Sequence, residues 1–98
     1  MTRKVRVAGG LVGRLAWRWL SVDMLWIPED LRGHGVGSAV LRATEKHAAS
    51  RGYGWSRLES GIPSRSFYER NGYSIFAALD EYPPGGRQHY MRKTLVSH

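Results

Sequence analysis

Cysteine is absent from this 98-residue chain. A disulfide framework and a thiolate metal site are therefore excluded. The four histidines are scattered without the spacing of metal ligands, so we expect no bound metal. Long apolar runs are also missing: no stretch approaches the ~20 residues of a membrane span, and the opening MTRKVRV leads into no signal-peptide core. We expect a cytoplasmic protein without a membrane partner.

Acidic residues are scarce, with 8 Asp and Glu against 15 Lys and Arg, and the formal charge is +7. Such a charge favours a polyanionic partner, which is a nucleic acid, an acidic protein face or a ligand with several phosphates. The basic residues are spread along the whole chain instead of being gathered in one arm. This distribution weakens the nucleic-acid interpretation, and we expect no nucleic-acid partner.

The hydrophobic pattern predicts one domain over residues 1–98, with elements in the order β-β-β-α-β-α-β-β. Alternating and β-branched segments predict six strands, at 4–7, 11–20, 21–27, 55–60, 73–79 and 89–95. Good helix formers, each run followed by a glycine, predict helices at 37–51 and 64–71.

Side-chain periodicity predicts which faces of these elements are buried. Strand alternation separates Val22, Met24 and Trp26 from Asp23, Leu25 and Ile27, so Asp23 is a carboxylate on an otherwise apolar face. In the first helix the pattern predicts a buried stripe and a solvent face. The predicted stripe is Val36, Ala39, Val40, Ala43 and His47, and the predicted solvent face is Ser38, Arg42, Glu45 and Lys46.

The segment LRGHGVGS, residues 31–38, has three alternate glycines directly before and at the start of the first predicted helix. A helix N-terminus has unpaired N–H groups and a partial positive charge, and glycines let an anion approach the backbone closely. No lysine follows these glycines, which argues against a P-loop. Their G-x-G-x-G spacing does not match the dinucleotide fingerprint either. The segment suits a diphosphate.

This loop resembles the signature Arg/Gln-x-x-Gly-x-Gly/Ala of the GNAT superfamily of acetyl-CoA-dependent N-acetyltransferases. The matching residues are Arg32, Gly33, His34, Gly35, Val36 and Gly37, and MLWIPEDLRG, SFYERNGY and EYPPGGRQHYMRKTL extend the resemblance over residues 10–95. It implies an α/β (α+β) fold with a mixed, mostly antiparallel sheet of about six strands and two helices. It also implies acetyl-CoA as co-substrate. The main chain of Leu25, Trp26 and Ile27 would hold the pantetheine arm, and the amides of Arg32 to Ser38 would hold the pyrophosphate.

Acetyl transfer from a thioester to an amine needs stabilisation of an oxyanion, a proton for the thiolate and a route for the amine proton. A backbone N–H near Trp26 or Ile27 is the candidate oxyanion donor. The resemblance implies that Tyr68 is the acid, and its alternative role is packing of the short helix on the sheet. Asp23 is the candidate base. Its alternative role is an ion pair with Arg14 or Arg18.

Members of the resembled family carry a strand and two helices before the region matched here, and those helices form one wall of the acceptor groove. We therefore expect a homodimer that completes the acceptor side, through Trp17, Trp19 or Tyr82. A separate partner chain would serve the same purpose. The alternatives to an enzyme are a non-catalytic acyl-CoA-binding module and a basic nucleic-acid-binding protein.

Overall fold

The computed structural model describes residues 3–7 and 10–95 of the chain, which form one six-stranded sheet and two α-helices. The strands are β1 (Arg3–Val7), β2 (Leu11–Ala16), β3 (Trp19–Leu25), β4 (Trp55–Gly61), β5 (Ser74–Asp80) and β6 (Arg87–Thr94). The helices are α1 (Val36–Ser50) and α2 (Arg65–Arg70), and short 3-10 turns lie at Glu29–Leu31 and Ile62–Ser64.

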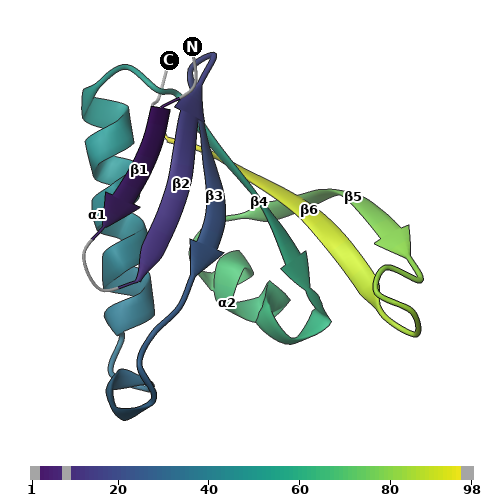
Figure 1. Cartoon of the computed structure of the whole chain (residues 1–98). Helices are drawn as coiled ribbons and strands as arrows, with labels where there is room; N and C mark the ends of the chain where they lie inside the picture. Colours follow the sequence, from purple (N-terminus) through teal and green to yellow (C-terminus); the bar gives the residue numbers. More distant parts are fainter. Residues whose placement is uncertain (1–2, 8–9, 96–98) are drawn as a thin grey trace.

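The strand order is β1-β2-β3-β4-β6-β5, and only the β3–β4 pair is parallel. This arrangement confirms the predicted α+β class, the mostly antiparallel sheet and the order of elements. Figure 1 shows α1 lying along β1 to β3, α2 near the ends of β3 and β4, and the β5–β6 hairpin projecting from the rest. Among the described residues, no helix is long and apolar enough to cross a membrane.

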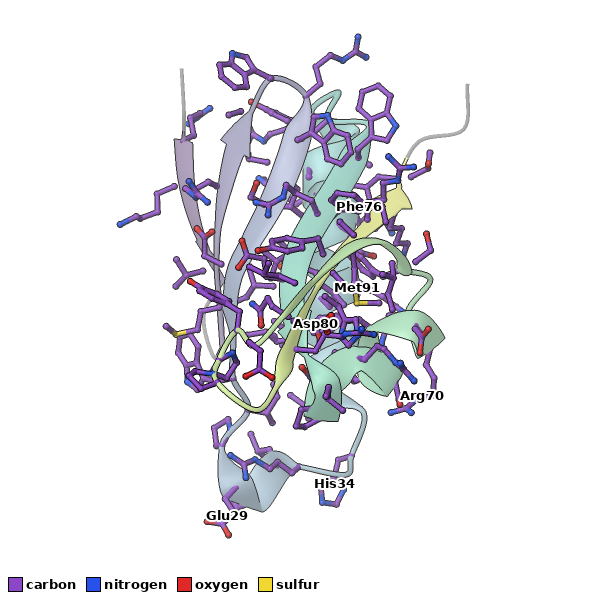
Figure 2. The ribbon with its side chains drawn as sticks, turned by 90° about the vertical axis from the view of Figure 1, so that its right-hand side faces the viewer. Glu29, His34, Arg70, Phe76, Asp80 and Met91 are labelled. Carbon is purple, nitrogen blue, oxygen red and sulfur yellow. The ribbon has the colours of Figure 1, made fainter. Side chains whose placement is uncertain are left out.

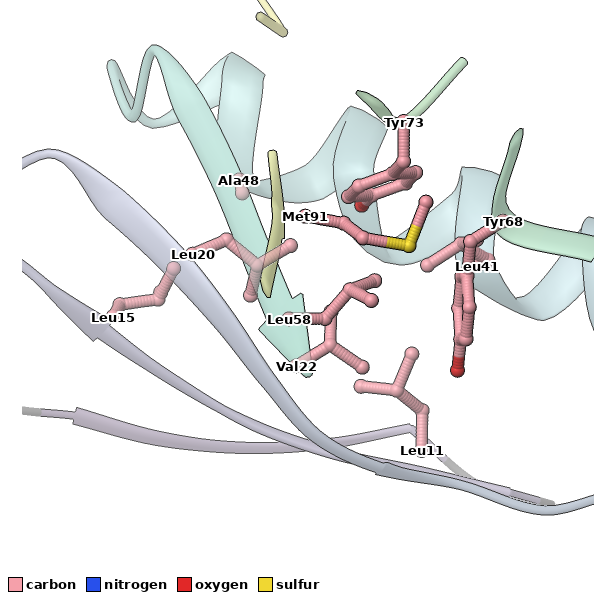
Figure 3. Close-up of a cluster of buried hydrophobic side chains, with 10 residues drawn as sticks. All are labelled: Leu11, Leu15, Leu20, Val22, Leu41, Ala48, Leu58, Tyr68, Tyr73 and Met91. Carbon is pink, nitrogen blue, oxygen red and sulfur yellow. The ribbon is translucent and has the colours of Figure 1, made fainter. Parts of the chain in front are cut away.

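The hydrophobic core lies between the sheet and the two helices (Figure 3). Its strand members alternate along the sequence, so that each strand buries one face and leaves the other to solvent. The core contains Leu11, Leu15, Leu20, Val22, Leu41, Ala48, Leu58, Tyr68, Tyr73 and Met91. The opposite face of the sheet carries no helix of the described chain (Figure 1).

A β-bulge at Asp23 changes the predicted alternation of β3. Val12 pairs with Met24 and Gly13 pairs with Val22, so Asp23 is the extra residue between two paired positions. Leu25 therefore packs against the core, whereas Met24 is 57% exposed. The prediction that Val22 and Met24 share a face is wrong, because the extra residue turns the strand by one position.

The buried stripe of α1 also differs from the prediction. Leu41, Thr44, Glu45 and Ala48 are the buried residues of the helix, whereas Ala39, Ala43 and His47 are exposed. Leu41 has the largest aliphatic side chain facing the core, and its burial determines the rotation of the helix. Glu45 can follow it inside because Lys93 and Tyr73 contact its carboxylate.

Candidate active site

The loop between β3 and α1 uses two of its three glycines for their backbone conformation. Gly33 has φ of 81° and Gly35 has φ of 75°, in the left-handed region where a side chain is strained. Gly35 is the N-cap of α1, and a Cβ atom there or at Gly33 would meet no atom within 4 Å. The backbone of the loop is therefore open to solvent at both positions.

The third glycine is needed for packing. A Cβ atom at Gly37 would lie 3.3 Å from Cζ of Phe67, so the absence of a side chain lets the Phe67 ring of α2 rest on the first turn of α1. Gly37 thus helps to determine where the two helices meet.

The amides at the start of α1 lack acceptors in the part of the chain that the structure describes. The Ala39 N–H donates to the Gly35 carbonyl at 3.1 Å, but the N–H groups of residues 33–38 have no such partner. The Arg32 amide was predicted to bind the pyrophosphate with the other amides of the loop. This prediction is wrong for Arg32, because its N–H donates to the Glu29 carbonyl at 3.3 Å. A cluster of unpaired donors at a helix N-terminus is suited to an anion.

A cleft of about 330 Å³ lies over these amides. The Arg32 side chain borders it, and its Nε donates to the Ile27 carbonyl at 3.1 Å, which leaves the terminal guanidinium nitrogens for a ligand. Arg70 and Phe67 of α2 also line the cleft. His34 is exposed at the outer end of the loop, as Figure 2 shows together with Arg70. The cleft therefore combines helix-terminal amides with two arginines.

The sequence interpretation missed Phe67 and Arg70. The two residues lie three positions apart in one helix and so share a face, and this spacing was the available signal. It did not show which face would meet the glycine loop, because that depends on how α2 packs against α1.

Asn71, also missed, ties the two helices together at the same place. Its side-chain Nδ2 donates to Ser38 Oγ at 3.2 Å and to the Phe67 carbonyl at 2.9 Å. Ser38 accepts one of these hydrogen bonds and keeps its own hydroxyl proton. The start of α1, which carries the unpaired amides, is thus held by the end of α2.

β3 and β4 separate beside this cleft. Their parallel pairing runs from Trp19 with Trp55 to Val22 with Leu58, and the last three residues of each strand are not paired with each other. Such a gap exposes main-chain hydrogen-bonding groups of β3 that a neighbouring strand would otherwise cover.

The direction of the β3 backbone assigns these groups. The Trp26 N–H donates to the Gly10 carbonyl at 2.7 Å, on the β2 side, and is therefore not available as the predicted oxyanion donor. Because successive residues of a strand point their N–H and C=O groups to opposite sides, those of Leu25, the last residue of β3, face the gap. Ile27 lies beyond the end of β3, and its carbonyl accepts from Arg32. A Cβ atom at Gly10 would collide with the Trp26 carbonyl, so this position requires glycine.

Tyr68 of α2 lies with its ring in the core and only 9% of the residue exposed. The ring makes an edge contact with Tyr73, at 5.9 Å between centroids, so the predicted packing role is confirmed. Figure 3 shows its hydroxyl pointing toward the end of the core where Leu11 lies. Burial raises the pKa of the Tyr68 phenol, which keeps it protonated at neutral pH. The hydroxyl is a buried, protonated donor.

Asp23 is engaged in an exposed, two-pronged ion pair with Arg14. Arg14 Nε lies 2.9 Å from Oδ2, and Nη2 lies 2.9 Å from Oδ1. The alternative role of Asp23 as a paired strand carboxylate is therefore confirmed for Arg14. Its role as the base stays a prediction.

Comparisons with known proteins agree with this geometry. Residues 3–73 match the acetyltransferase (GNAT) family. Blasticidin-S acetyltransferase of Streptomyces morookaense is 40% identical over 91 residues, which are 91% of this chain and 67% of that protein. Acetyltransferase Atu2258 of Agrobacterium fabrum is 35% identical over 80 residues, which are 81% of this chain and 58% of that protein.

A crystal structure of an acetyltransferase from Bacillus cereus ATCC 14579 superposes with a TM-score of 0.83 at 28% identity. The match covers 96% of this chain and 71% of that one. The sequence match and the shared fold cover both the glycine loop and the separated strands. The chain therefore belongs to the GNAT family of acetyltransferases.

Proposed function

We propose that this acetyltransferase transfers an acetyl group from acetyl-CoA to a primary amine of a small molecule or protein, by direct attack in a ternary complex. One observation carries the proposal: residues with unpaired amides, Gly33 and Gly35 to Ser38, line a cleft of about 330 Å³ that Arg32 and Arg70 also border. Helix-terminal amides and guanidinium groups together suit a diphosphate. The pantetheine arm then lies in the gap between β3 and β4, along Leu25 and Ile27.

The proposed chemistry gives these groups separate roles. The neutral amine attacks the thioester carbonyl carbon, a C–N bond forms, and the C–S bond breaks. The Ile27 N–H is the donor proposed for the oxyanion, since the Trp26 N–H is already engaged by the Gly10 carbonyl. The Tyr68 hydroxyl supplies the proton of the departing thiolate and is replenished from solvent. The amine proton leaves through Asp23 or through water, since Asp23 directly follows the last residue of β3 that pairs with β4, where the two strands separate.

The test is acetyl transfer to a panel of amines. The reaction is monitored through the release of the coenzyme A thiol. Blasticidin S belongs in the panel because the relative from Streptomyces morookaense is named for it. We expect turnover with at least one amine and saturable binding of acetyl-CoA. Binding without turnover would favour the non-catalytic module. Binding of oligonucleotides that falls steeply with salt, without any coenzyme A binding, would favour the nucleic-acid interpretation.

Tyr68→Phe separates catalysis from binding. Removal of the hydroxyl leaves the ring packed in the core, so we expect kcat to fall by about 10²-fold or more, as for loss of a general acid. Affinity for coenzyme A, measured by calorimetry, should change little. An unchanged kcat would contradict the acid role while leaving the coenzyme site intact.

A further inference from the structure

The uncovered face of the sheet carries a row of arginines across neighbouring strands. Arg14 of β2 pairs in register with Ser21 of β3, and Ser21 pairs with Arg57 of β4. Arg57 in turn pairs with Arg92 of β6. Directly opposed like charges, as at Arg57 and Arg92, destabilise a sheet. A row of this kind needs negative charge nearby.

The protein supplies only part of that charge. Arg14 is paired with Asp23, and Arg57 reaches Glu59 with a single contact of 3.4 Å. Arg92 has no carboxylate partner among the described residues, and its guanidinium carbon lies 5.2 Å from the centroid of the Phe76 ring. One exposed cation of the row is therefore left for an external anion.

Arg92 borders a cleft of about 530 Å³ on this face, with Arg57, Trp19 and Phe76. Figure 2 shows Phe76 on β5, where this strand crosses in front of the sheet. A helix that packs on a sheet face normally meets aliphatic side chains, but this cleft is lined by three arginines, three aromatic rings, a serine and a single alanine. Its volume and mixed lining are those of a small-molecule site.

The cleft adjoins the place where β3 and β4 separate. A second, smaller cleft of about 210 Å³ shares Arg14 and Arg57 with the first and is also lined by Asp23 and Glu59. These carboxylates lie where the two strands separate, and there the acetyl group would be presented if the proposed function is correct. A groove therefore leads from the gap, past the arginines, to Trp19 and Phe76.

Three chemical zones follow one another along this groove. Asp23 and Glu59 lie at the gap, the arginine row comes next, and the stacked rings of Trp19 and Trp55 follow, at 5.6 Å between centroids. Neighbouring rows on one face of a strand are about 7 Å apart. A cationic amine suits the first zone, an anion the second and a flat or apolar group the third.

We propose that this groove is the acceptor site and that the acceptor is a small amine carrying an anionic group, a carboxylate or a phosphate, one row from the amine. The proposal rests on the proposed acetyl transfer and goes further by naming the substrate class. Arg92 is its specificity-determining residue. A single-stranded nucleic acid would also find arginines and stacked rings here. We favour the small molecule because Phe76 borders a cleft of limited volume.

The experiment compares 6-aminohexanoate with its neutral amide, 6-aminohexanamide, and with 6-aminohexyl phosphate. Turnover gives KM for each amine, and calorimetry without acetyl-CoA gives its binding constant. We expect the wild-type protein to prefer one of the anionic amines over the neutral amide. In Arg92→Gln, KM and Kd for that anion should rise about tenfold or more, the loss expected for a charge-assisted hydrogen bond. The values for the neutral amide should change little.

Arg51→Gln is the matched control, because Arg51 is an exposed arginine at the C-terminal end of α1, outside both clefts. An equal loss of affinity in Arg51→Gln would overturn the proposal and leave only a net-charge effect. Equal affinity for the anionic and neutral amines would overturn it as well. If no amine is acetylated, the proposed function fails, but the binding measurements still decide whether the groove selects anionic amines. An Arg92-dependent affinity for oligo-dT with no binding of either anion would replace the proposal by nucleic-acid binding.

Discussion

Glu45 illustrates how single residues are held inside this small domain. The residue is only 6% exposed, although its position in the sequence predicted a solvent-facing side chain. Lys93 Nζ lies 2.8 Å from Oε1, and the Tyr73 hydroxyl donates to Oε2 at 2.7 Å. Ser56 donates in turn to the Tyr73 hydroxyl at 2.7 Å. The buried carboxylate therefore has a partner for each oxygen, which offsets its loss of hydration.

Tyr73 makes the stability of the protein sensitive to alkaline pH. Burial and the neighbouring negative charge of Glu45 raise the pKa of Tyr73 above its ordinary value of about 10. Because the folded pKa exceeds the unfolded one, the contribution to stability is complete below about pH 10 and is lost as the pH rises above it. We expect the free energy of unfolding to fall by about 1.4 kcal/mol per pH unit for this group.

Tyr73→Phe removes this group, so its denaturation curves should show a shallower loss of stability above about pH 10 than those of the wild type. The substitution also lowers stability at neutral pH, because Glu45 and Ser56 lose a partner. Only the slope of the free energy of unfolding with pH tests the titration of the Tyr73 phenol. Identical slopes in the two proteins would contradict the role of Tyr73.

At the scale of elements, the start of α1 is determined by its neighbours as much as by its own residues. The left-handed conformations of Gly33 and Gly35 are local, and the glycine spacing in the sequence predicted an open anion loop. The contacts of Phe67 with Gly37 and of Asn71 with Ser38 come from α2. They could not be predicted, because they depend on the packing of two helices that are far apart in the sequence.

Gly35→Ala tests whether the loop conformation serves the coenzyme. An alanine in the left-handed region costs about 1–2 kcal/mol, and the backbone would shift to relieve that strain. We expect this loss in the free energy of unfolding together with about tenfold weaker binding of coenzyme A by calorimetry, as for one lost charge-assisted hydrogen bond.

Gly85→Ala is the control for Gly35→Ala. Gly85 has a similar φ of 77°, and a Cβ atom there also meets nothing within 4 Å, but the residue lies in the β5–β6 turn. It should show a similar loss of stability and unchanged affinity. Equal weakening of coenzyme binding in both variants would mean that strain alone, and not the shape of the loop, explains the effect.

At the scale of the whole molecule, the β5–β6 hairpin leaves one sheet edge open. Within residues 3–7 and 10–95, β5 pairs only with β6, and all its residues are exposed, including Ile75, Phe76 and Leu79. An apolar edge strand of this kind favours pairing with another chain. Of the aromatic residues expected at a dimer contact, Trp17 and Tyr82 are 88% and 57% exposed, whereas Trp19 is stacked on Trp55.

The homodimer stays a prediction, and we expect its contact at this edge. Light scattering at tens of micromolar should give the mass of two chains. In Leu79→Lys the measured mass should fall toward that of one chain, because a lysine on an edge strand disfavours pairing with another strand. A monomer in the wild type would contradict the dimer. A dimer that persists in Leu79→Lys and dissociates in Trp17→Ser would move the contact to the β2–β3 turn.

The sequence by itself determined the features that depend on short stretches of chain. Glycine spacing predicted the anion loop, alternation and turn residues predicted the order of strands and helices, and the Tyr68 segment supported the family resemblance. The β2–β3 turn is a counterexample: the predicted strands 11–20 and 21–27 meet after residue 20, whereas the turn lies at Trp17 and Arg18, which adopt φ of 50° and 68° without a glycine signal.

Only the tertiary structure decided which residues act together. The bulge at Asp23, the burial of Glu45, the contact of Phe67 with the loop and the row of arginines on β2, β4 and β6 all require strand register or helix packing between distant segments. Register depends on the whole sheet, because a shift by one residue exchanges its two faces. The periodicity of a single strand contains no such information.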